Sequence, residues 1–177
     1  MLGDELQAGK PHACDILREH VIQWLLFLHI LSVFVFLVAH GVSVFVLFRV
    51  RRERDRTKIL ELLTFSGETT LPMYISMGAI VVFGVLLGLK ESTFSHWWIW
   101  LAIGVLIATS ALMGAIAKPY FAKLKLACAM RPTGVPRASD EELAQLLSAP
   151  TAMIISAIGS IGLVVILYLM VFQPGVT

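Results

Sequence analysis

The sequence predicts an all-α fold: a polytopic membrane protein in which four transmembrane helices form one bundle, with both termini outside. Three observations predict this class. Hydrophobic residues make up 58% of the 177 residues and charged residues only 15%, whereas a soluble domain has about a quarter charged residues. Four apolar stretches have about the length, ~20 residues, that crosses a bilayer. Most basic residues lie in two of the segments between these stretches.

The predicted organisation is a single four-helix membrane domain at 21–172. It lies between an extracytoplasmic tail at 1–20, with a short helix at 16–20, and a C-terminal tail at 173–177. The tail at 1–20 is charged and lacks an apolar centre, which predicts no cleavable signal. Pro72 suits the first turn of the second span, and tryptophans from Trp97 onward suit the headgroup level. The predicted spans are 21–48, 71–89, 96–117 and 151–172, and the predicted cytoplasmic loops are 49–70 and 118–150.

The distribution of charge predicts the orientation. The loop after the first span has six basic residues, the loop after the third has five, and only three lie elsewhere. The positive-inside rule therefore places both loops in the cytoplasm of a bacterial inner membrane and both termini outside. This orientation separates Cys14 from Cys128, so the two cysteines form neither a disulfide nor a metal site.

The two cytoplasmic loops contain further predicted structure. The apolar residues of 56–65 lie among charges and predict a short helix at the membrane surface. Ser139 and Glu142 form a capping-box pattern that predicts a second short helix, ending near Pro150. The segment 131–137 is rich in proline and glycine and predicts an irregular linker. The basic loop at 49–70 is interpreted as a topology determinant, with a lipid-headgroup or partner site as the alternative.

Small residues recur four positions apart in three of the spans. Such pairs let helix backbones approach closely in lipid, so we expect them at helix–helix contacts. The pairs are Gly84 and Gly88, Ser110 and Gly114, and Ser156 and Ser160, with Gly159 and Gly162 beside the last.

One face of the first span carries the polar residues that invite a functional interpretation. His29, Ser32, His40 and Ser43 fall within roughly 60° of one another at about 100° per residue, with Phe36 between them. A histidine that faces lipid is costly, so this face should turn toward other helices or a buried ligand.

The two histidines are candidate cofactor ligands. Buried histidine is a ready axial ligand of haem iron, and methionine is an accepted partner, so His29 and His40 are candidate ligands of haem b. Met77, Met113 and Met153 lie near the depth of His40 and are weaker candidates. Thioether and imidazole ligands also suit copper(I), the less favoured metal. Gly84 and Gly88 could leave space for a flat ring beside His29.

The alternative is that the histidines only hold helices together. In that case they form hydrogen bonds across the bundle, with Ser156, Tyr74 or Tyr168 as expected partners, and the methionines fill gaps.

Several functional classes find no support in the sequence. The spans contain no carboxylate, no glycine-rich phosphate loop precedes a helix, and no nucleophile lies near a base. The net charge of +2 is too small to indicate nucleic-acid binding. The spans also lack the breaks with midplane polar residues that are typical of transporters. We therefore expect a protein without enzymatic activity.

Three short motifs resemble a group of four-span membrane proteins. They are Leu28-His29-Ile30, Leu71-Pro72-Met73 and Trp97-Trp98. The group contains a predicted integral membrane protein family of unknown function, which is the most similar. It also contains the related copper-resistance protein D membrane domain and the HemJ-type protoporphyrinogen oxidases. The resemblance covers about residues 24–125 and implies the fold. The first-span histidine of the HemJ-type enzymes is thought to serve haem, which the resemblance transfers to His29.

Two functions follow as hypotheses. The first is an integral membrane subunit or scaffold that packs within a larger assembly, with the lipid bilayer and other membrane subunits, or copies of itself, as partners. The alternative is a haem b- or copper-binding membrane redox protein that uses His29 and His40.

Overall fold

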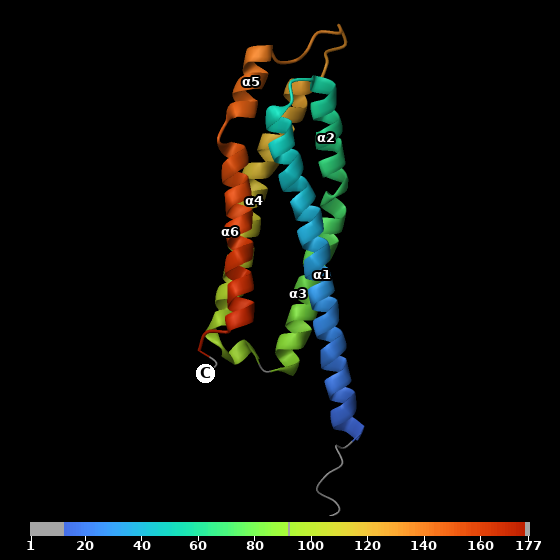
Figure 1. The fold of residues 1–177 in the computed structure, drawn as a ribbon, viewed down its shortest axis with the longest axis vertical. Coiled ribbons are helices and arrows are strands. Elements are labelled where there is room, and N and C mark those ends of the chain that lie inside the picture. Colours follow the sequence, from blue (N-terminus) through green and yellow to red (C-terminus); the bar gives the residue numbers. More distant parts are fainter. Residues whose placement is uncertain (1–12, 92, 176–177) are drawn as a thin grey trace, which may run out of the picture.

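The computed structural model describes residues 13–91 and 93–175, with side chains from Ile16 onward. These residues form six α-helices and one turn of 3-10 helix (Figure 1) and no strand. The elements are α1 (Ala13–Arg52), α2 (Arg56–Glu68), α3 (Thr70–Lys90), η1 (Thr93–Ser95), α4 (Trp97–Cys128), α5 (Asp140–Ser148) and α6 (Thr151–Phe172).

Four helical stretches are long and apolar enough to cross a membrane, which confirms the all-α, multi-pass prediction. They are Ile16–Arg52, Arg56–Lys90, Trp97–Cys128 and Asp140–Phe172. The first residues of α1 and the end of α6 lie at the same end of the molecule, which we call the terminal end (Figure 1). The opposite end carries α2, α5 and most of the basic residues, and we call it the basic end.

The helices pack as two pairs, α1 with α3 and α4 with α6. The pairs are joined at the basic end, where α1, α2, α4, α5 and the start of α6 surround the main hydrophobic core. A smaller core at the terminal end joins the start of α4 to α6 through Trp98, Ile99, Ala102 and Leu169. The main core consists of Val46, Leu47, Val50, Ile59, Leu63, Tyr120, Leu124, Ala127, Cys128, Leu143, Leu147, Ala152 and Ile155.

The first helix differs from the prediction of a short helix followed by a separate span. It is continuous over its 40 residues, because no proline interrupts it and the charged residues before 21 are compatible with helix. At a rise of ~1.5 Å per residue it is about 60 Å long, roughly twice the thickness of a bilayer core. α1 therefore extends beyond the apolar layer.

Residues 56–65 form a helix, as predicted, and this helix packs against other helices. α2 leads almost directly into α3, with only Thr69 between them (Figure 1). Its apolar face, including Ile59 and Leu63, is buried in the main core. α4 likewise continues past the predicted end at 117, because Tyr120 and Leu124 pack into the same core. The buried apolar side chains of α2 and of the end of α4 thus pack against other helices.

Three arginines bind the carboxyl ends of neighbouring helices. Arg18 donates to the last carbonyl of α3 at 3.3 Å, and Arg51 to the last carbonyl of α5 at 3.3 Å. Arg56 donates to a carbonyl in the last turn of α4 and to the carboxylate of Asp140, each at 2.7 Å. A cation at a helix carboxyl end is favourable because the free carbonyls there carry partial negative charge. Arg51 and Arg56 therefore hold helices together, beyond any effect on topology.

The connection between α4 and α5 is more regular than predicted. Met130 and Pro136 form an isolated antiparallel bridge, and Gly134 turns the chain between them with a φ of +78°. The capping box of Ser139 and Glu142 is present as predicted. The break between α5 and α6 falls at Pro150, also as predicted.

Candidate functional site

His29 on α1 contacts α3. Its Nδ1 lies 3.0 Å from the carbonyl oxygen of Ile80. Its ring lies against Gly84, where an added Cβ would be only 3.1 Å from the ring carbon Cε1. Glycine at 84 is therefore what lets the imidazole fit between the two helices.

The hydrogen bond of His29 determines which ring nitrogen is free. A carbonyl oxygen only accepts, so Nδ1 carries a proton, and in the neutral imidazole Nε2 then carries the lone pair. Nε2 has no hydrogen-bond partner in the part of the chain that the structure describes. Histidines that bind metal commonly have this arrangement, with a carbonyl fixing the ring through the other nitrogen.

His40 contacts α6 instead. Its ring stacks on Phe36 with the ring centres 5.8 Å apart and the planes 6° from parallel. Its Nε2 is buried without a hydrogen-bond partner among the described residues. A Cβ added to Gly159 would lie 2.9 Å from this Nε2 and 3.6 Å from the terminal methyl carbon of Met113. This nitrogen is therefore closed off by the helix backbone.

Ser32 and Ser43, the two serines on the polar face of α1, form hydrogen bonds with nearby groups. Ser32 donates to the carbonyl of Leu28 one turn earlier, at 2.7 Å. Ser43 lies 3.2 Å from the hydroxyl of Thr69 and 3.3 Å from that of Ser66. This small hydroxyl cluster links α1 to the junction of α2 and α3.

These contacts confirm that the polar face of α1 turns inward. They also show that its two histidines serve different interfaces, His29 with α3 and His40 with α6. The two positions are about 16 Å apart along the helix at ~1.5 Å per residue. The space that was expected at Gly84 and Gly88 is filled, because the ring of His29 lies against Gly84 and the ring of Phe94 lies against Gly88. The described residues therefore contain no single site built by both histidines.

The other candidate residues are dispersed. Met113 is the only candidate methionine that shares a contact with His40 among the described residues. Met77 accepts a long hydrogen bond from Ser110 at 3.8 Å, and Met153 is 57% exposed. None of the expected hydroxyl partners (Ser156, Tyr74 and Tyr168) bonds either histidine in the described chain.

Of the two histidines, only His29 keeps the arrangement expected of a cofactor ligand. An axial ligand needs an imidazole nitrogen with a free lone pair and space in front of it. Nε2 of His29 meets the first requirement and is not closed off by Gly84, whereas Nε2 of His40 is covered by Gly159. Within 13–91 and 93–175, no group of three or more histidine, cysteine, aspartate or glutamate side chains is arranged to hold a metal ion.

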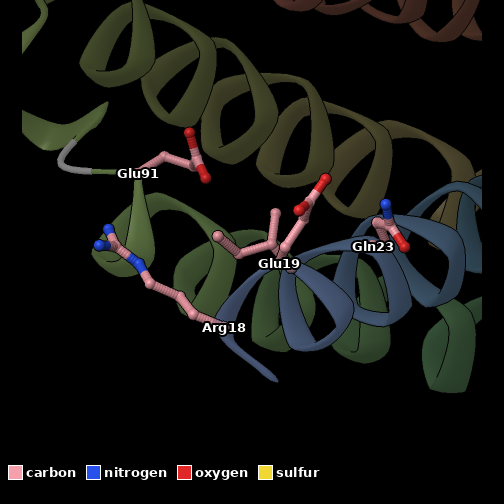
Figure 2. Close-up of a pocket in the computed structure, with 5 residues that line it drawn as sticks. Arg18, Glu19, Gln23 and Glu91 are labelled. Carbon is pink, nitrogen blue, oxygen red and sulfur yellow. The ribbon is translucent and has the colours of Figure 1, made fainter. Parts of the chain in front are cut away.

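A pocket at the terminal end was not predicted from the sequence. It is an open hollow of about 510 Å³ and is lined by Arg18, Glu19, Ile22, Gln23 and Glu91 (Figure 2). The four residues from α1 are spaced so that they share one face, which sequence periodicity could have shown. Glu91 follows α3 and is brought to this face only by the packing of α3 on α1.

A smaller hollow at the basic end contains a pair of opposite charges. Arg49 and Glu53 form an ion pair with a nitrogen–oxygen distance of 3.8 Å. The pKa of Glu53 is below its usual value, because the backbone N–H groups of Arg54 and Asp55 donate to its carboxylate. The carboxylate of Glu53 is therefore already satisfied by neighbouring groups.

No protein-family model, curated protein or solved structure matches this chain.

Proposed function

We propose that the chain is a membrane subunit or scaffold that completes its packing against other transmembrane helices. The observation that carries this proposal is the lack of buried residues in the middle of α3 and α4. Residues 77–87 of α3 and 103–119 of α4 include no buried residue. A bundle that is complete by itself buries one face of each helix along its whole length. Here the middles of α3 and α4 are covered only in part, whereas the two hydrophobic cores lie at the basic end and the terminal end.

The exposed side of α4 supports a protein partner rather than lipid alone. Gly104, Ala108, Ala111 and Ala115 are all exposed and lie on one face at helical spacing. An added Cβ at Gly104 would meet nothing within 4 Å. Small residues on a transmembrane face permit close approach of a second helix, since lipid supplies no hydrophobic force between helices. The partner is another membrane protein or a second copy of this chain.

The proposal predicts that larger side chains on the small-residue face of α4 prevent assembly without unfolding the chain. Gly104→Leu combined with Ala108→Leu should convert a larger complex to the free chain in native mass spectrometry from mild detergent. Thermal stability of the isolated chain should stay within about 0.5 kcal/mol, because both sites are exposed. Ala157→Leu, an exposed small residue on α6, is the matched control and should leave the complex intact. Wild-type protein that is monomeric, or an unaffected double variant, would contradict the proposal.

The charge distribution favours an orientation for this subunit. The basic end would lie in the cytoplasm of a bacterial inner membrane, with both termini outside, because cytoplasmic loops are enriched in lysine and arginine.

A second candidate function is a haem b- or copper-binding redox protein. The hydrogen bond from His29 to the carbonyl of Ile80 favours it, because that bond leaves Nε2 unprotonated and orients the ring. His29 would hold the iron or copper, and the bound group would supply one-electron chemistry. A second protein ligand would come from another chain, since His40 faces a different helix.

An absorption spectrum of the purified protein tests this second function. A Soret band should be present after expression with haem available, be lost in His29→Ala and be retained in His40→Ala. For copper, His29→Ala should abolish stoichiometric Cu(I) binding measured by competition with a chromogenic chelator. A colourless preparation that binds neither group would leave only the subunit proposal.

A further inference from the structure

The terminal-end pocket (Figure 2) is lined by charges of both signs at the edge of the apolar surface. Arg18, Glu19, Ile22 and Gln23 come from the first turns of α1 described with side chains, and Glu91 follows the last turn of α3. Its volume of about 510 Å³ is within the range of small-molecule sites, roughly 300–1,000 Å³. It can therefore hold a small polar group.

The acceptors of the pocket are not neutralised by any side chain that the structure describes. In Figure 2 the carboxylates of Glu19 and Glu91 point to the same side, although they belong to different helices. Neither forms an ion pair with any residue of 13–91 or 93–175. The side-chain amide of Gln23, one turn after Glu19, adds a third acceptor group on the pocket wall. Together they form an arrangement that suits a cation with several N–H donors.

The guanidinium of Arg18 supplies the opposite charge. In Figure 2 it extends away from the Glu19 carboxylate, toward the side where Glu91 lies, and it donates one N–H to the carbonyl of Lys90 at 3.3 Å. This bond fixes its position at the end of α3, while its remaining N–H groups have no partner among the described residues. A guanidinium with free donors is a good phosphate ligand.

The surroundings of the pocket are apolar. Leu17 and Val21 on α1 and Leu89 on α3 are exposed large side chains within a turn of its lining residues. Trp97, also exposed, begins α4 just beyond Glu91. Exposed tryptophan at the end of an apolar helix is typical of the membrane–water boundary. The pocket is thus placed where a lipid headgroup meets its acyl chains.

We propose that this pocket binds the headgroup of a phospholipid that carries both a phosphate and a primary ammonium group. The phosphate lies on Arg18, and the ammonium donates its three N–H bonds to Glu19, Gln23 and Glu91. The acyl chains lie along the exposed leucine and valine side chains of α1 and α3. This inference is independent of the proposed function, because it concerns the other end of the molecule from the main core and uses neither histidine nor the α4 face.

Lipid titrations observed by native mass spectrometry test the proposal. The full chain in detergent is titrated with phosphatidylethanolamine, phosphatidylcholine and phosphatidylglycerol of identical acyl chains. Phosphatidylethanolamine should bind about tenfold more tightly, a difference near 1.4 kcal/mol, because the trimethylated amine of phosphatidylcholine has no N–H to donate. Glu19→Gln combined with Glu91→Gln should abolish this preference. Arg18→Gln should weaken binding of all three lipids, since all three carry a phosphate.

Matched controls make the outcome decisive. Glu141→Gln, an exposed carboxylate on α5 at the opposite end, should leave the preference unchanged. The altered side chains are exposed, so each variant should keep the helical content and melting temperature of the parent. Equal affinity for the three lipids, or a preference that survives the double substitution, would overturn the proposal. Displacement of the lipid by an equal concentration of soluble glycerophosphoethanolamine would overturn its assignment to a membrane lipid.

Discussion

Leu124→Ala is expected to lower the free energy of unfolding by about 2–5 kcal/mol. Leu124 is fully buried in the main core, which also holds Ile59 of α2 and Leu147 of α5. The substitution removes apolar contact area and leaves a cavity that the surrounding helices only partly fill. Because this core joins the two helix pairs, its loss should affect the whole molecule. Equilibrium unfolding in mixed micelles, followed by circular dichroism, measures the change.

Leu126→Ala is the control for this prediction. It makes the same chemical change two residues away on α4, but Leu126 is 54% exposed. Leu126→Ala should change the free energy of unfolding by no more than about 0.5 kcal/mol, as other surface substitutions do. Similar losses from both variants would mean that α4 does not pack into a core at the basic end.

Gly162→Ala is expected to destabilise the α4–α6 pair by about 1–3 kcal/mol. An added Cβ would lie 2.5 Å from the hydroxyl oxygen of Thr109 and 3.1 Å from its Cβ. The second of these atoms is attached directly to the backbone of α4, so rotation of the side chain cannot relieve the contact. The two helices must therefore move apart, which should lower the temperature of thermal unfolding.

Gly78→Ala gives the comparison for the glycine substitution. An added Cβ at Gly78 on α3 would meet nothing within 4 Å. Alanine there should be neutral or stabilising by up to about 1 kcal/mol, because glycine is the poorer helix former. The two substitutions are thus expected to change stability in opposite directions. A stabilising Gly162→Ala would show that α4 and α6 are not in close contact at this position.

The features that the sequence predicted correctly depend on local patterns. The spans follow from hydrophobicity over about 20 residues, and the capping box of Ser139 and the break at Pro150 follow from short-range backbone chemistry. The inward turn of the histidine face on α1 follows from helical periodicity and the cost of a polar group in lipid. Each of these predictions needs only neighbours along the chain and the nature of the solvent.

The features that were missed depend on which helix packs against which. Residues 56–65 were predicted to form a short helix at the membrane surface, because an amphipathic face suits either lipid or protein. In the structure, α1 and α4 pack against the apolar face of this helix. The glycines at 84 and 159 were expected to bring backbones together or leave room for a cofactor. They instead accommodate the rings of His29 and His40.

The sequence by itself determined that this is a four-span helical membrane protein with an inward polar face on its first helix. Only the tertiary structure decided that His29 meets α3 while His40 meets α6, and that Glu91 joins Glu19 at one pocket. The physical reason is that hydropathy and periodicity act within a helix, whereas helix pairing depends on the shapes of two surfaces. In lipid, where apolar burial does not select partners, shape and a few polar contacts make that selection.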